Sequence, residues 1–175
     1  ACHDNDAAAC VRDVLAFDEA VAEAVRFYRK HPDETLVIVT ADHECGGMSL
    51  GYTAKGYALD AGRLLKQRTS AVRFARQVAT WREQGTGFDT ALPQILDAFG
   101  FDQLAAHELL ALSAAYRLSM TPPSERRLTH GQLLEYGKYE PLAIAAARLV
   151  NHQAGVAFTT FSHSAVPVPV TAAGP

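Results

Sequence analysis

Apolar side chains recur at every third or fourth position near the start of the chain, which predicts an amphipathic helix over residues 5–30. Its apolar positions are Val14, Phe17, Val21, Ala24, Val25 and Tyr28. Asp and Asn side chains at residues 4–6 supply N-caps, and Pro32 ends the helix. A break within residues 15–18 is also open, because Asp18 could cap a second segment.

A short, apolar and β-branched run follows at residues 35–40. Such a run predicts a strand buried on both faces, as in a parallel sheet. Strand-like patterns return at residues 156–161 and 166–172. The second alternates valine with proline, which removes ladder donors and predicts an edge strand or an extended connection. A helix followed by a buried strand is half of a βαβ unit, so we expect an α/β fold.

Between these segments the chain is mostly helical. Residues 41–57 are glycine-rich and loop-like. The helices expected after them cover residues 58–66, 70–84, 90–99, 102–118 and 141–152. We expect one structural domain in three stretches. Residues 1–57 would supply a helix, a buried strand and the metal-ligand loop of the α/β core. Residues 58–137 would form a mainly helical insertion, and residues 138–175 a helix and the final strands that return to the core.

The composition excludes some classes of protein. With 49% hydrophobic and 20% charged residues, it is that of an ordinary globular domain. A net charge of −3 provides no basic field for nucleic acid. The apolar runs are too short for a membrane span, and no signal peptide is visible.

The three cysteines, Cys2, Cys10 and Cys45, are irregularly spaced. An odd number at such spacing does not indicate a disulfide framework, so we expect free or buried thiols. Cys2 and Cys10 could pair only if the fold brings their backbones together.

The strongest candidate for chemistry is Asp42 with His43, directly after the predicted strand. Ligands of open α/β sheets bind beyond the carboxyl ends of strands, and carboxylate and imidazole are normal zinc donors. His3 and His163 are weaker candidates, because a lone histidine beside a helix start or in a serine-rich loop is more often structural. The remaining histidines are expected to be structural or solvated; they are His31, His107, His130 and His152.

Three motifs, in order, resemble those of alkaline phosphatases. Residues 40–47, Thr-Ala-Asp-His-Glu-Cys-Gly-Gly, are similar to the family's Thr-Ala-Asp-His-Glu-Thr-Gly-Gly. Residues 3–8, His-Asp-Asn-Asp-Ala-Ala, resemble its His-Ala-Asn-Asp-Ala-Ala. Residues 162–170, Ser-His-Ser-Ala-Val-Pro-Val-Pro-Val, resemble its Ser-His-Thr-Gly-Val-Pro-Val-Pro-Val. The helical block between them is where the family varies.

The resemblance implies the C-terminal part of an α/β/α sandwich with a mostly helical insertion. It also implies hydrolysis of phosphate monoesters through a phosphoserine-type intermediate, with two Zn²⁺ per complete site and with Mg²⁺, whose ligands would lie mostly outside this chain. Asp42 and His43 match ligands of one zinc, and His3 and His163 match ligands of the other. Two such ions, about 4 Å apart, clamp both ends of an in-line phosphoryl transfer. The family location would be periplasmic or extracellular.

Several parts of the family site have no match here. They are the serine nucleophile, most magnesium ligands and the Asp that stands four residues before the position of His3. We therefore expect no catalytic residue within the chain and no turnover from the chain alone. An exposed sheet edge and apolar face would favour a homo-oligomer.

Two alternatives stay open at this point. The chain could belong to another member of the same two-metal superfamily, such as a phosphodiesterase or a sulfatase. It could also be a non-catalytic domain that uses the fold for binding or assembly. The cationic residues Lys55, Arg63 and Lys66 could meet an anionic substrate, although solvated surface charge is the simpler interpretation.

Overall fold

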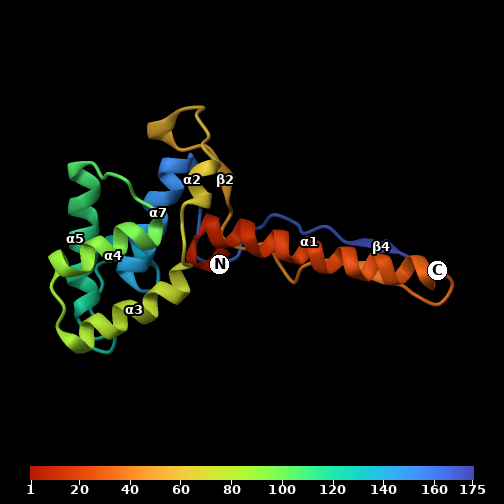
Figure 1. The fold of residues 1–175 in the computed structure, drawn as a ribbon, viewed down its shortest axis with the longest axis horizontal. Coiled ribbons are helices and arrows are strands. Elements are labelled where there is room, and N and C mark those ends of the chain that lie inside the picture. The colour runs from red at the N-terminus through yellow and green to blue at the C-terminus, as the bar shows by residue number, and fades with distance from the viewer.

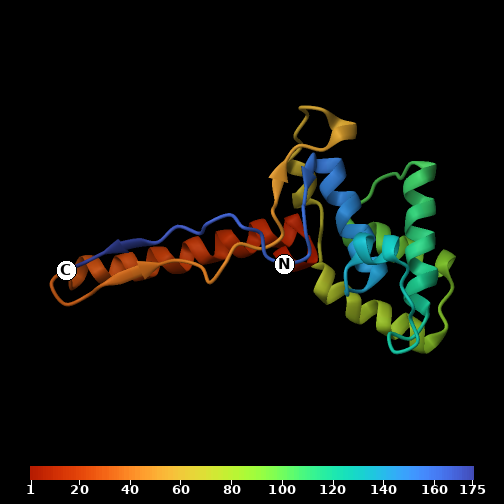
Figure 2. The same cartoon turned by 180° about the vertical axis from the view of Figure 1, so that it is seen from behind.

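A computed structural model describes all of residues 1–175 and shows a helical body with a long arm (Figure 1). The arm consists of helix α1 (Ala7–Lys30) with strands β1 (Val37–Val39) and β4 (Thr171–Ala173) beside it. Figure 2 shows the same arrangement from behind, with the C-terminus near the tip of the arm. The N-terminus lies where arm and body meet.

Helix α1 is continuous, so the break considered at residues 15–18 does not occur. It follows a 3₁₀ turn, η1 (Cys2–Asp4), and begins after Asp6, whose carboxylate accepts a hydrogen bond from the Ala9 N–H. The helix ends at His31, with Arg29 and Lys30 in its last turn, where positive charge complements the helix dipole. The capping residues read from the sequence therefore set both ends.

The body contains six helices. They are α2 (Gly62–Leu65), α3 (Ala71–Gln84), α4 (Phe88–Phe99), α5 (Ala106–Met120), α6 (His130–Tyr136) and α7 (Pro141–Ala154). Helix α2 is shorter than expected, and α6 was not expected at all. The signal for α6 is a capping box, in which Thr129 and Gln132 exchange side-chain and backbone hydrogen bonds. No helix combines the length and apolar character that crossing a bilayer requires.

The hydrophobic core lies in this body and is centred on α7, which packs against α5, α3, α4 and α2. Alanines make up much of α7 and are buried on several sides, which lets neighbouring helices approach closely. Larger side chains fill the space between α3 and α4, where Phe74 meets both Trp81 and Phe99 edge to face.

The strands form two separate antiparallel pairs. Strand β1 pairs with β4, with Val37 opposite Ala173, and β2 (Ser49–Leu50) pairs with β3 (Val156–Ala157). The prediction that residues 35–40 form a strand buried on both faces is wrong for this chain, because the Ile38 residue is 59% exposed. Strand β1 pairs only with β4 and contacts α1. Neither element covers the side chain of Ile38.

The other strand predictions were too long. Of residues 156–161 only the first two are in β3, and of residues 166–172 only the end belongs to β4. The valine–proline alternation forms an extended connection that leads to β4. This fits its composition, because proline has no backbone N–H to donate to a neighbouring strand.

Cys2 and Cys10 form a disulfide, so the expectation of free thiols is wrong for these two residues. The turn η1 folds back on the start of α1 and brings their Cα atoms to 5.6 Å, within the range that a disulfide spans. Cys45 is a free thiol, as expected.

Asp6 joins the start of α1 to the body. It is 1% exposed, and it accepts hydrogen bonds from the Gln67 side chain at 2.9 Å and from the Ala71 N–H at 2.7 Å, besides the cap to Ala9. One carboxylate thus satisfies donors on three segments, and its removal leaves them buried without partners.

We expect Asp6→Ala to lower the free energy of unfolding by about 2–4 kcal/mol, from the lost cap and the unpaired donors. Urea unfolding can be followed by the fluorescence of Trp81, the only tryptophan, which is 2% exposed. The control is Asp18→Ala, an exposed position on the same helix. Equal losses in the two variants would contradict this role of Asp6.

Candidate metal centre

Three histidines from distant parts of the sequence converge where the arm meets the body. His3 lies on η1, His43 lies in the loop after β1, and His163 lies in the segment after β3. One ligand atom from each lies within 4.8 Å of the others. The structure therefore brings together three of the four residues that the sequence singled out.

Backbone carbonyls orient two of the imidazoles. The Nδ1 atom of His3 is 3.2 Å from the Phe161 carbonyl oxygen, and that of His43 is 3.1 Å from the Glu44 carbonyl oxygen. A carbonyl oxygen only accepts, so Nδ1 is the donor in each contact, and Nε2 of each ring is left as the candidate ligand atom. This arrangement is typical of metal-binding histidines.

The rings pack against one another. His43 and His163 are stacked, with centroids 3.6 Å apart, and His3 lies 5.3 Å from His163 and 5.7 Å from His43. A backbone bridge between Cys45 and His163 holds the two loops together.

Asp42, the fourth predicted ligand, lies at the edge of this cluster. Its Oδ2 atom is 3.3 Å from Nε2 of His43, and its side chain is 85% exposed. Its other oxygen accepts a hydrogen bond from the His43 N–H at 3.0 Å. The carboxylate is thus held beside the imidazole and open to solvent.

Glu44 connects the two ligand-bearing loops. Its carboxylate accepts a hydrogen bond from the Gly47 N–H at 2.9 Å within its own loop, and another from the Ser164 hydroxyl, beside His163. The hydrogen bond from Ser164 is the main reason that the pKa of Glu44 lies below its ordinary value. Glu44 therefore fixes the loop of His43 relative to that of His163.

Gly46 allows the loops to approach this closely. It has a φ of +87°, and a Cβ there would lie 2.9 Å from both the Cys2 carbonyl oxygen and the Phe158 ring. Its N–H donates to the Ser162 carbonyl at 2.9 Å, and its carbonyl accepts from the Thr159 N–H at 2.9 Å. The neighbouring thiol of Cys45 is sheltered, and burial raises its pKa.

The donor set fits a zinc ion. Imidazole nitrogens and a carboxylate oxygen are zinc ligands, and nitrogens on a tetrahedral zinc lie about 3.3 Å apart. The histidine ligand atoms lie within 4.8 Å of one another, close enough to serve two neighbouring ions about 4 Å apart.

Comparison with known proteins decides the family. The family described as "Alkaline phosphatase" matches residues 1–175, the whole of the sequence. The chain belongs to the alkaline phosphatase family.

Three proteins illustrate the similarity. The repressible alkaline phosphatase of Saccharomyces cerevisiae is 48% identical over 46 residues, which are 26% of this chain and 8% of the yeast protein. Alkaline phosphatase 4 of Bacillus subtilis is 43% identical over 51 residues, 29% of this chain and 11% of that protein. The crystal structure of a cold-active alkaline phosphatase from the psychrophile Shewanella sp. matches with a TM-score of 0.71 and 27% identity.

That match covers 100% of this chain and 37% of the Shewanella chain, so the chain spans little more than a third of this relative. The alkaline phosphatase fold expected from the sequence is thereby confirmed. The sequence motifs found the histidines but missed Glu44 and Ser164 as connectors, because nothing local to either residue indicates that they meet.

We expect Glu44→Ala to weaken zinc binding by about 10- to 100-fold, the range for residues that orient metal ligands. Glu44→Gln should recover part of the affinity, because its amide oxygen can still accept from the Gly47 N–H while its amide N–H donates to the Ser164 hydroxyl oxygen. Competition with a chromogenic chelator measures the affinity, and Glu19→Ala on the exposed side of α1 is the control. An unchanged affinity in Glu44→Ala would contradict the assignment.

Proposed function

We propose that His3, His43, His163 and Asp42 are zinc ligands and that the chain forms part of a phosphatase that hydrolyses phosphate monoesters. The observation that supports this most is the convergence of three imidazoles, within 4.8 Å, from three separate segments. Each segment carries one of the motifs that resemble the family. A structural role alone does not explain three polar rings placed beside an open carboxylate.

Within this proposal the ligands divide between two ions, Asp42 and His43 on one and His3 and His163 on the other. The stacking of His43 on His163, with centroids 3.6 Å apart, supports two neighbouring ions. Zinc at such sites polarises phosphoryl oxygens and lowers the pKa of the attacking oxygen. The chain's own part is to present Nε2 lone pairs from His3 and His43 and to hold the loops in register through Glu44.

The rest of the machinery is proposed to lie outside these residues. No serine nucleophile motif and no third protein ligand for either ion was found in the sequence, and zinc sites normally use three or four ligands. The serine that would carry the phosphoryl group and most ligands of a Mg²⁺ ion would come from the remainder of the enzyme. A chain of these residues alone would then bind zinc weakly and would not turn over substrate.

A periplasmic or extracellular location fits one observation. Cys2 and Cys10 form a disulfide, and disulfides form and persist mainly in oxidising compartments. The disulfide links Cys2, next to His3, to Cys10 on α1. An oxidising compartment, by forming this bond, would therefore also help to hold His3 in place.

We expect the chain to bind Zn²⁺ and to lose most of that affinity in the double variant His43→Ala/His163→Ala. Isothermal titration measures affinity and stoichiometry, and His107→Ala, outside the cluster, is the control. The wild-type chain should show no hydrolysis of p-nitrophenyl phosphate with zinc and magnesium. Zinc binding that survives the double variant would refute the ligand assignment, and turnover would refute the proposed division of the site.

Self-association is a further expectation of the proposal. The arm leaves Phe17, Phe27, Ile38 and Val170 more than half exposed, and β1 has a strand partner on one edge only. Apolar surface beside an open strand edge favours association. Light scattering should therefore show a dimer or larger species, and Ile38→Lys should shift it towards monomer. A monomer at high concentration would contradict this expectation.

A further inference from the structure

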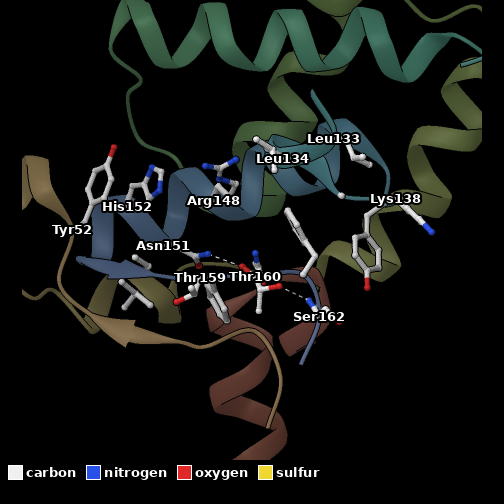
Figure 3. Close-up of a pocket in the computed structure, with 17 residues that line it drawn as sticks. Tyr52, Leu133, Leu134, Lys138, Arg148, Asn151, His152, Thr159, Thr160 and Ser162 are labelled. Carbon is white, nitrogen blue, oxygen red and sulfur yellow. Dashed lines mark hydrogen bonds between the residues drawn. The ribbon is translucent and has the colours of Figure 1, made fainter. Parts of the chain in front are cut away.

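A pocket of about 690 Å³ lies beside the candidate metal centre, between α6, α7 and the segment that runs from β3 to His163 (Figure 3). This volume is that of a site for a small organic molecule. The family assignment and the four proposed ligands give the pocket no role.

Internal hydrogen bonds satisfy the polar groups along one side of the pocket. The Asn151 amide donates to the Asn5 carbonyl at 2.6 Å, and its oxygen accepts from the Ala7 N–H at 3.3 Å. The Ser162 N–H donates to the Thr160 hydroxyl at 3.0 Å, as Figure 3 shows. This wall is therefore ordered before any ligand arrives, which lowers the entropy cost of binding.

The other walls are largely apolar and aromatic. Tyr139 and Phe161 lie with ring centroids 5.7 Å apart, and Tyr52 stacks on His152 at 3.8 Å. On α6, Leu133 is 43% and Leu134 is 68% exposed. Such walls suit the faces of a flat apolar molecule.

The charge of the lining contrasts with that of the whole chain. Among its 17 residues there is no Asp or Glu, whereas Lys138 and Arg148 are both present. Neither forms a salt bridge, and Arg148 donates only to the Glu135 backbone carbonyl. Burial lowers the pKa of His152 to about 4, so this ring is uncharged at neutral pH. The lining thus carries two cations and no carboxylate, in a chain with a net charge of −3.

The pocket and the metal centre share residues. Ser162, which lines the pocket, directly precedes His163. The carbonyl of Phe161, another lining residue, is the hydrogen-bond partner of His3. The pocket and the candidate zinc ligands are therefore joined by one short segment, residues 161–163.

We propose that this pocket binds organic anions with a flat apolar body, and that it takes the alcohol part of phosphate monoesters whose alcohol is aromatic and carries its own negative charge. The first part rests on the pocket alone, and the assignment to substrate rests on the proposed function. The aromatic walls hold the body, while Lys138 and Arg148 favour the anionic group over a neutral one.

The test uses the 175-residue chain and two probes of the same shape, naphthalene-2-carboxylate and naphthalene-2-carboxamide. Titrations followed by NMR are run in EDTA, so that no zinc can bind the carboxylate. We expect the carboxylate to bind about threefold to tenfold more tightly than the amide, as expected for partly exposed charges. Equal affinities, no binding of either probe, or binding that requires zinc would each overturn the proposal.

Matched variants locate the site. Leu134→Asp should abolish binding of both probes, whereas Leu110→Asp, on α5 and equally exposed at 69% against 68%, should not. Lys138→Gln should remove part of the preference for the carboxylate, and Lys55→Gln, outside the pocket, should leave it intact. Loss of binding in both aspartate variants, or an unchanged preference in Lys138→Gln, would overturn the proposal.

Zinc titration of the same samples separates this proposal from the proposed function. Leu134→Asp should bind zinc like the wild type, because Leu134 lies on α6 and is not one of the candidate ligands. A chain that binds the carboxylate but no zinc would support the pocket and refute the zinc ligands. A chain that binds zinc but binds the carboxylate no more tightly than the amide would support the zinc ligands and refute the pocket.

Discussion

The segment that follows β3 is held against the loop after β1 by main-chain hydrogen bonds on both sides of Gly46, and the site depends on this contact. The contact is possible because position 46 has no Cβ: any side chain there would collide with the Cys2 carbonyl and the Phe158 ring. It brings His163 over His43, while Phe161 reaches His3. A single close approach of two backbones thus assembles three imidazoles that the sequence separates widely.

Local signals determined the helices better than the strands. Asp6 and Pro32 mark the ends of α1, and glycines that adopt positive φ end α3, α4 and α7, so these elements could be predicted closely. The strands could not, because continuous β-branched sequence indicates burial but does not say what provides it. Ile38 lies in a run whose sequence is typical of a strand buried on both faces, yet its side chain is exposed because neither α1 nor β4 covers it.

The candidate site divides in the same way. His3, Asp42, His43 and His163 could be found because each stands inside a motif with recognisable neighbours. The hydrogen bond between Glu44 and Ser164 could not, because it joins residues from opposite ends of the chain and depends on the fold. The Cys2–Cys10 disulfide was missed for a related reason: spacing alone does not reveal that a 3₁₀ turn folds back on the helix that follows it.

We expect the candidate metal centre and the pocket to be coupled, because one segment builds them both. Residues 159–162 line the pocket and bind Gly46 and His3 with their backbone, so a ligand in the pocket contacts the segment that also positions His163. The coupling must act in both directions, because binding free energies at two linked sites are reciprocal. Ions held by the proposed ligands would then favour the same arrangement of this segment that the pocket presents to its ligand.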